Sequence, residues 1–377
     1  MDNSKFRSHF NIHKCLISSP ARFNGDYEDN ELLIASAHPS MRNRTLYTTQ
    51  RDNEYNESQM SRYYYVCTFD FLPEPDQKIV IPDNSFIGDF ISIALAVYYG
   101  KRFDNHGILE SYGIFWMPNY EPIFSISNSH VGITNHLPRK DLEIPLEFDN
   151  CEAIIKFILT RNDKLHRYFF AAGKFYLNSL QIMDQDIEKA YLDLITCGEI
   201  LSNFYDYTDD ELYDENLKKI FIKLACMGEE SDIKYLKIRL YQVRRKFNLT
   251  LKSLLNKKFF SKTESNNESV KLKEECIEIN IKAAYDIRSK YVHTGQSFKP
   301  YIEQMYRNIN EVGIPGLEPN VDDKDLKKVL KRIPTYIGLE RIIRFALLRF
   351  LHTNGVYIHK DLDDDKDAKQ ERELNSD

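Results

Sequence analysis

The sequence lacks the features that mark several large classes of protein. Its cysteines never come within C-x-x-C distance of one another, so the spacing typical of zinc sites and redox pairs is missing. No hydrophobic leader stands at the start, and no apolar run approaches the ~18 residues of a membrane span. The longest such run, FIGDFISIALAVYY, is interrupted by Asp89. We expect a soluble, cytoplasmic protein with free, buried thiols and no membrane partner.

Signatures of nucleotide sites and hydrolases are also missing. The chain contains no GxxxxGK[ST], no GxGxxG and no GxSxG, so P-loop, Rossmann and nucleophile-elbow chemistry has no support. His9, His13 and Cys15 have helical metal spacing, but no fourth ligand stands nearby. We therefore expect neither a metal nor a cofactor.

What the chain does contain is enough apolar material for a large folded core. Hydrophobic residues make up 42% of its 377 residues, with 24 Tyr and 23 Phe but a single Trp116. The net charge of -6 is concentrated in residues 361–377, where eight acidic and three basic residues leave the rest near -1. We expect this acidic tail to be disordered. A nearly neutral body does not exclude an anionic substrate at a local basic site.

The first part of the chain, residues 1–148, predicts an α+β domain. The stretches SRYYYVCTFDFLP, QKIVIP, SYGIFWMP and EPIFSIS have the composition of short strands. Between them, a helix is expected to begin at Asn84 or Ser85 and to end at Gly100. The first 60 residues show no clear period.

Residues 149–360 predict an all-α bundle, because long amphipathic segments follow one another. These segments are 150–182, 184–204, 214–227, 231–256, 270–293 and 326–352. Asp149, Asp184, Asp214 and Ser269 are expected N-caps, and Gly228, Gly295 and Gly355 are expected ends. Pro334 is expected to kink or split the last segment.

The segment 272–293 contains Arg288 and His293, the two residues on which the functional interpretation depends. Its apolar residues form a wide arc at helical spacing, so we expect this helix to lie centrally in the bundle. Arg288 falls inside that arc and must be paired, reach a cleft or face another subunit. His293 lies about 140° from Arg288 on a regular helix, so the two converge only if the last turn frays or if a second copy supplies one of them.

An Arg and a His near a helix end are most often structural or solvated, and R-x4-H alone is a weak pattern. The wider string AYDIRSKYVHTG nevertheless resembles the motif helix of HEPN domains, in particular the ApeA-like branch. Arg288, Ser289, His293 and Gly295 match that motif, with Thr294 inserted before the glycine. AYLDLITCGEILSNFY is similar to the family's second helix, in which a glutamate sits in an apolar stretch; Glu199 would be that residue. RYFFAAGKFYLNSL is similar to the family's first long helix. The resemblance covers roughly residues 160–355.

The resemblance implies a metal-independent RNA endonuclease that works as a homodimer. The ribose 2′-OH would attack the neighbouring phosphate and leave a cyclic phosphate. His293 would then act as general acid or base, and Arg288 would stabilise the charge that grows on the phosphate. Ser289 and Lys290 would contact the substrate or remain solvated, and Glu199 and Tyr291 would have supporting roles.

The setting that the resemblance suggests is prokaryotic antiviral defence or toxin-like growth arrest. Residues 1–148 would then sense a trigger, such as a protein, or restrain the nuclease. The alternative is a non-catalytic HEPN module that binds nucleotide, RNA or a protein partner. A purely structural scaffold is a third possibility.

Two cationic segments bear on RNA binding. The segment 235–260 mixes basic residues with Tyr and Phe, which suits phosphate contacts and base stacking, but it also fits an ordinary amphipathic helix. The last helix, with Arg341, Arg344 and Arg349, allows the same two interpretations.

Overall fold

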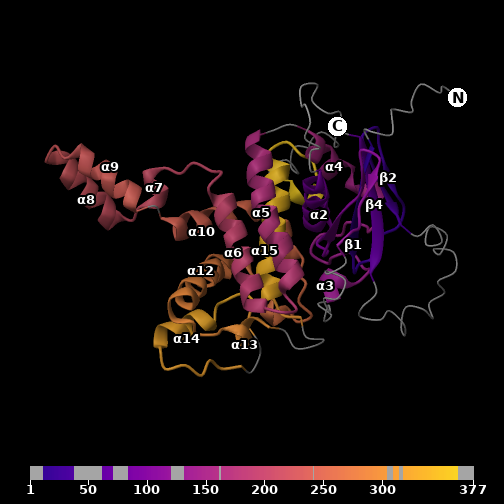
Figure 1. Cartoon of the computed structure of the whole chain (residues 1–377). Helices are drawn as coiled ribbons and strands as arrows, with labels where there is room; N and C mark the ends of the chain where they lie inside the picture. The colour runs from indigo at the N-terminus through magenta and orange to yellow at the C-terminus, as the bar shows by residue number, and fades with distance from the viewer. Residues whose placement is uncertain are drawn as a thin grey trace, which may run out of the picture.

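The computed structural model describes residues 12–37, 62–70, 84–119, 131–160, 163–240, 242–303, 309–313 and 317–363. An antiparallel sheet with one long helix on its face forms the N-terminal part, and a largely helical region follows (Figure 1). The predicted order, α+β and then all-α, is confirmed. Within the described part of the chain, no helix is long and apolar enough to cross a membrane.

The sheet has six strands in the order β2-β3-β4-β1-β5-β6, with every neighbouring pair antiparallel. The strands are β1 (Ile12–Ser19), β2 (Tyr27–Glu28), β3 (Leu32–Ser36), β4 (Tyr63–Asp70), β5 (Asp104–Ser111) and β6 (Ile114–Phe115). β4 confirms the predicted strand in SRYYYVCTFDFLP, and β6 covers two residues of SYGIFWMP. The predicted strands in QKIVIP and EPIFSIS lie outside the described residues.

Helix α2 (Ser85–Tyr99) lies between the sheet and the helical region, and its second half is buried on all sides. Its bounds agree with the prediction, because Asn84 is the N-cap and Gly100 the C-cap. Gly100 has a φ of 64°, and a Cβ there would stand 2.6 Å from Nε of Arg344. Glycine is therefore required at this position both by the backbone and by the neighbouring helix.

The helical region begins with short elements and continues with longer helices. The described helices after α2 are α3 (Val131–Thr134), α4 (Glu152–Leu159), α5 (Asp163–Ile182), α6 (Ile187–Ser202), α7 (Asp209–Leu212), α8 (Glu215–Cys226), α9 (Glu230–Arg239), α10 (Val243–Leu254), α11 (Lys257–Ser261), α12 (Ile277–Thr294), α13 (Lys299–Ile302), α14 (Lys324–Leu330) and α15 (Tyr336–Thr353). Short 3₁₀ segments span Phe148–Cys151, Glu268–Val270, Glu274–Cys276 and Lys360–Leu362.

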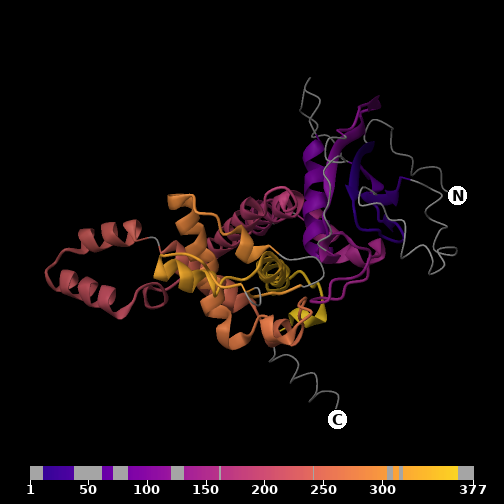
Figure 2. The same cartoon turned by 90° about the horizontal axis from the view of Figure 1, so that it is seen from below.

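The central helix of the bundle is α15. Every residue from Tyr336 to Leu351 is buried, and Figure 2 looks almost along this helix with the others around it. The prediction that segment 272–293 lies centrally is wrong. α12 packs against α6, α10 and α14 but leaves Ile279 and Val292 exposed, because its apolar arc is wider than the surface that its neighbours cover.

Buried charges join the N-terminal part to α15. Arg139 contacts Glu340 at 2.6 Å and Glu264 at 3.0 Å, and Arg344 contacts Asp141 at 3.0 Å. We call these five residues the ionic core. All of their side chains are at most 4% exposed, so each charge must be matched by a partner.

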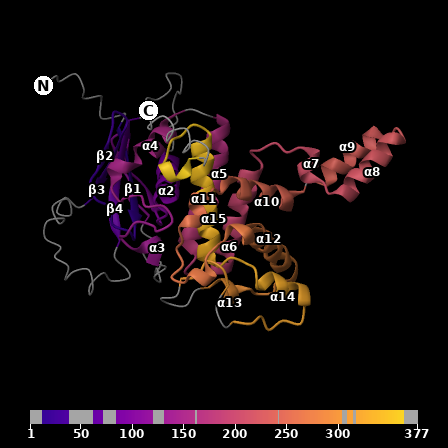
Figure 3. The ribbon, with the colours of Figure 1, turned by 180° about the vertical axis from the view of Figure 1, so that it is seen from behind.

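A helical hairpin, here called the arm, consists of α7, α8 and α9. It projects on the side of the bundle away from the sheet (Figure 3). In α8 only Phe221 is buried, and it packs against Tyr213 at the base of the hairpin. Four large apolar side chains of the arm are exposed: Ile220, Ile222, Met227 and Tyr235.

The predicted helix bounds need several corrections. The segment 150–182 is divided into α4 and α5, and 231–256 into α9 and α10, where Gln242 takes a positive φ of 51°. Asp214 is an N-cap as predicted, but Asp149, Asp184 and Ser269 are not. The N-caps of α4, α6 and α12 are Cys151, Asp186 and Cys276. Pro334 separates α14 from α15, as predicted.

All six cysteines are free, as predicted, but only four are buried. Cys226 and Cys276 are exposed, which corrects the expectation for those two thiols. The predicted acidic tail lies almost entirely outside the described residues; of its members, Asp361 pairs with Lys262 at 2.9 Å.

Candidate site at the end of helix α12

Helix α12 presents the R-x4-H motif in its last two turns. The helix runs without interruption to Thr294, and the N–H of Gly295, which has a φ of 65°, donates to the carbonyl of Tyr291. Gly295 thus ends the helix in the left-handed conformation that the sequence predicted. Ile277, Ile281, Ala284 and Ile287 anchor the buried face of α12.

Arg288 is fixed by an acid from another helix. Its Nη2 lies 3.2 Å from Oε2 of Glu199 on α6, and its guanidinium lies 5.7 Å from the centre of the Tyr285 ring. The Arg288 side chain is 32% exposed, whereas that of Glu199 is 15% exposed. The pair therefore holds the guanidinium at the edge of the core and leaves part of it open to solvent.

Tyr285 is a member of this cluster that the sequence reasoning missed. It stands one helical turn before Arg288, and that i, i+3 spacing was the signal available. Burial raises the pKa of Tyr285, and the charge of Glu199 and a hydrogen bond with it raise that pKa further. The phenol therefore stays protonated near neutral pH and can donate to Glu199.

His293 does not meet Arg288 within one chain. Because α12 stays regular through Thr294, the two side chains point about 140° apart and are separated by about 7.5 Å along the axis. The idea that a frayed last turn redirects the histidine is therefore wrong. His293 is exposed, and among the described residues it has no hydrogen-bond or ion-pair partner.

The remaining predicted site residues have different surroundings. Ser289 is exposed, and Lys290 makes an ion pair with Asp323, 2.8 Å away at the start of α14. A hydrogen bond from Lys290 and the first amides of α14 lower the pKa of Asp323 to about 2. Tyr291 packs edge-on against Phe298, with ring centres 5.3 Å apart. Tyr291 therefore supports the loop after α12, and Lys290 already has an anionic partner.

In the basic segment 235–260, Tyr235 is 57% exposed, but two of the phenylalanines are core residues. Phe247 and Phe259 are completely buried in the core, and Gln242 interrupts the helix. Arg244 pairs with Asp286 at 2.6 Å, and Lys252 pairs with Glu278 at 2.8 Å. These two cations lie against the polar face of α12, so α10 fits the amphipathic-helix interpretation.

The arginines of the last helix have structural roles. Arg341 is fully buried and contacts Glu311 at 3.0 Å, and Arg344 belongs to the ionic core. Arg349 is 4% exposed. None of the three is accessible to RNA. Within the described ranges, no group of three or more His, Cys, Asp or Glu side chains is arranged to hold a metal ion.

Comparison with protein-family models, with curated proteins and with solved structures finds no match to this chain. The resemblance to HEPN domains therefore stays a prediction that rests on the motif in α12 and on the position of Glu199.

Proposed function

We propose that the protein is a metal-independent RNA endonuclease whose site is completed when two copies meet at the ends of their α12 helices. The observation that carries the proposal is the tip of α12 itself. There, a partly exposed guanidinium is oriented by an acid that is largely shielded from solvent, and an exposed imidazole follows five residues later. The proposal places the protein in the ApeA-like branch of the HEPN superfamily.

The geometry of Arg288 supports a role toward phosphate. Arginine binds phosphate oxygens through a planar fork, and a fork held from behind loses less conformational freedom on binding. Glu199 binds Nη2, and about a third of the side chain faces solvent. A nearby scissile phosphate can therefore reach the guanidinium without displacing the core.

Exposed apolar side chains support a contact between two copies. Ile279 and Val292 on α12 are 44% and 64% exposed, and the arm, which carries four more exposed apolar residues, projects from the part of the bundle away from the sheet, where α12 also lies (Figure 1). Covering such residues is the usual source of stability in a symmetric dimer. A second copy would also bring another His293 toward Arg288, which a single chain does not do.

The chemistry needs only groups that RNA and these two residues supply. The 2′-OH loses a proton to the His293 imidazole and attacks phosphorus, and the leaving 5′-oxygen takes up a proton from the imidazolium that results. The products are a 2′,3′-cyclic phosphate and a 5′-hydroxyl. Arg288 offsets the charge on the non-bridging oxygens as the phosphorane forms.

A non-catalytic binding module is the second candidate, and one observation favours it. Arg288 already has an acidic partner, and its histidine points elsewhere in the single chain. In that case, RNA, nucleotide or a protein would bind without cleavage. The proposed regulatory role of residues 1–148 and the defence or toxin setting depend on the nuclease and do not extend to this candidate.

The first test is cleavage of total RNA by the full chain in the presence of EDTA. We expect fragments with cyclic-phosphate and 5′-hydroxyl ends, and a loss of ~10²-fold or more in rate for His293→Ala. Arg288→Lys should also be strongly impaired, because a lysine cannot bind phosphate bidentately. Lys282→Gln, on the same helix but away from the tip, is the matched control. Undiminished cleavage by His293→Ala would refute the catalytic role.

The second test asks whether two copies share a site. Arg288→Ala and His293→Ala are mixed after reversible dissociation, and each is also assayed alone. If one copy supplies Arg288 and the other His293, mixed dimers contain one intact pair, and roughly a quarter of the wild-type rate should return. A mixture as inactive as its components, although dimeric, would show that the pair does not form between copies.

A further inference from the structure

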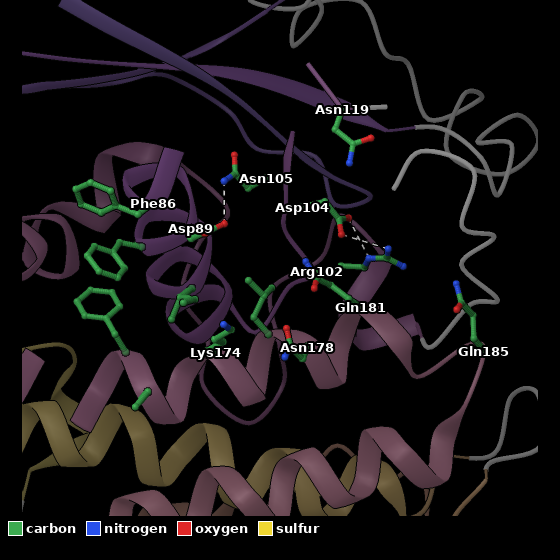
Figure 4. Close-up of a pocket in the computed structure, with 15 residues that line it drawn as sticks. Phe86, Asp89, Arg102, Asp104, Asn105, Asn119, Lys174, Asn178, Gln181 and Gln185 are labelled. Atoms are coloured by element: carbon green, nitrogen blue, oxygen red, sulfur yellow. Dashed lines mark hydrogen bonds and ion pairs between the residues drawn. The ribbon is translucent and has the colours of Figure 1, made fainter. Parts of the chain in front are cut away.

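A cavity of about 680 Å³ lies where the N-terminal part meets the bundle, and none of the residues at the α12 tip lines it. Helix α2 and strand β5 form one side of the cavity, and α5 forms the other (Figure 4). Cavities of about 300–1,000 Å³ are typical of sites for small ligands. Because its walls come from both parts of the chain, a ligand there would contact both.

The side chains that α5 contributes give the cavity two different ends. Phe170, Lys174 and Asn178 follow one another at four-residue spacing, so they share one face of the helix, with roughly 6 Å of axis between neighbours. Figure 4 shows Lys174 between Phe86 and Asn178. The aromatic end and the amide end are thus about 12 Å apart along the helix, so a single ring cannot reach both.

The end at Phe170 is aromatic. Phe90 and Phe170 stack with ring centres 4.3 Å apart, and Phe86 meets Phe90 edge-on at 5.6 Å. Ile93 and Leu177 add aliphatic surface to the cavity. Phe86 is 42% exposed, so part of its ring is open to a ligand. This end therefore favours a flat, apolar ring.

Lys174 supplies a positive charge that has no carboxylate within ion-pair distance. Among the described residues its ammonium group has neither an ion-pair nor a hydrogen-bond partner. The two acids that line the cavity are engaged elsewhere. Asp89 accepts a hydrogen bond from a side-chain amide of β5 at 2.8 Å, and Asp104 is shared by Arg62 and Arg102. The middle of the cavity therefore favours an anionic group.

The amide of Asn178 stands one helical turn beyond Lys174 and can bind the same group. In the part of the chain that the structure describes, this amide also has no hydrogen-bond partner. A carboxylate has two oxygens, so one can accept from the ammonium group and the other from the amide N–H. A single unmatched cation suits a singly charged carboxylate better than a doubly charged phosphate ester.

We propose that this cavity binds an aromatic carboxylate, with its ring at the three phenylalanines and its acid group held by Lys174 and Asn178. A short chain between ring and acid spans the roughly 6 Å of helix between Phe170 and Lys174. This inference does not depend on the nuclease proposal, because the cavity and the α12 tip share no residue.

Calorimetric titration of the full chain with 3-phenylpropionate tests the proposal, because a two-carbon chain joins the ring and the acid of this probe. We expect saturable binding of one molecule per chain. The uncharged 3-phenylpropionamide and the ringless propionate should each bind at least about tenfold more weakly. Equal binding of either compound, tighter binding of phenyl phosphate, or no binding of 3-phenylpropionate would overturn the assignment.

Lys174→Met tests the contact with the acid, because it removes the charge and keeps the aliphatic stem. Binding of 3-phenylpropionate should weaken about tenfold while binding of the amide stays the same, so that the preference for the acid disappears. Lys174 is exposed, so its variant should fold. The matched control is Lys219→Met, which replaces an exposed lysine of the arm that does not line the cavity. An equal loss in the control, or an unchanged preference in Lys174→Met, would refute the location.

Phe86→Ala tests the contact with the ring. Binding of 3-phenylpropionate and of its amide should both weaken, by about fivefold, whereas the ratio between them should stay the same. The matched control is Phe115→Ala, which removes an aromatic side chain that is 78% exposed and does not line the cavity. Undiminished binding by Phe86→Ala, or an equal loss in Phe115→Ala, would contradict the placement of the ring.

Discussion

Arg288 lies at the border between the core and the solvent, and its ion pair with Glu199 fixes the position of its guanidinium. Glu199 stands behind it on α6 at 3.2 Å, and Tyr285 lies beside both. The sequence predicts that an arginine in an apolar arc needs a partner, and the resemblance indicates Glu199. No local pattern predicts the third member, because the contact of Tyr285 with Glu199 depends on how α6 and α12 pack.

Replacement of Glu199 by Gln tests whether this acid positions the guanidinium. The variant keeps the shape of the side chain but removes the charge that orients Arg288. If the nuclease proposal holds, RNA should bind at least as tightly, because a negative charge near the phosphate is gone, and kcat should fall about tenfold. Single-turnover cleavage and binding of a non-cleavable RNA analogue measure the two quantities separately.

Glu278→Gln is the control for that experiment. Glu278 is also an ion-paired acid on this surface, but it lies ten residues before Arg288 on α12 and pairs with Lys252 and Lys282. Its replacement should leave kcat unchanged. If both variants lowered kcat equally, the effect of Glu199 would come from general electrostatics or stability and not from orientation of Arg288.

Among the secondary-structure elements, the helix ends that the sequence predicts correctly are those set by a single cap residue. Asp214 begins α8, Gly100 ends α2 and Gly295 ends α12, each through backbone geometry that those residue types favour. The break at Gln242 was not predictable in this way, since neither glycine nor proline stands there. Central burial was assigned to the wrong helix, because periodicity reveals an apolar face but not the partner that covers it.

Helix α15 comes very close to the backbone of residues 309–312 at Gly338, so a larger side chain there should destabilise the fold. A Cβ at Gly338 would stand 2.0 Å from the backbone oxygen of Glu311, and that oxygen cannot move without its segment. Gly338→Ala should therefore destabilise the protein by about 3 kcal/mol. Urea denaturation measures the change.

Gly173→Ala on α5 is the matched substitution. There the nearest atom is Cγ2 of Ile93 at 2.5 Å, a side-chain methyl group and not a backbone oxygen. We expect a smaller loss of about 1 kcal/mol. If Gly173→Ala cost more stability than Gly338→Ala, the backbone at Glu311 would be able to move away from α15, contrary to this prediction.

Across the whole molecule, the ionic core makes the two parts of the chain depend on each other. Arg139 and Asp141 come from the segment before α4, and Glu340 and Arg344 come from α15. The sequence predicts two domains with a boundary near residue 148, and no local signal reveals pairs about 200 positions apart. Deleting residues 1–148 would remove the charged partners of Glu340 and Arg344 and leave Glu340 with the hydroxyl of Tyr176, so regulation must be tested in the full chain.

Asp141→Asn tests this dependence through pH. Burial alone would raise the pKa of Asp141, but the charges of Arg344 and Arg139 hold it well below its ordinary value of 3.8. The stabilisation is therefore complete above that value and is lost as the pH falls toward the lower, folded-state pKa. We expect Asp141→Asn to cost about 3 kcal/mol at pH 7, and the difference from wild type to shrink below about pH 4.

An exposed pair provides the comparison. Glu152 and Lys156 form an i, i+4 ion pair with side chains more than 60% exposed, so Glu152→Gln should change the free energy of unfolding by less than about 0.5 kcal/mol. Both variants are measured by denaturation at several pH values. A pH-independent difference for Asp141→Asn would contradict the assignment of this carboxylate as the charged partner of Arg344.

The same separation in sequence has a consequence for synthesis. Asp141 leaves the ribosome 203 positions before Arg344, and at roughly 5–20 residues per second that interval lasts about 10–40 s. During this time the nascent sheet and α2 have no α15 to close against. The N-terminal part should therefore complete its folding only after α15 has left the ribosome, and a chain truncated before residue 336 should remain a substrate for chaperones and proteases.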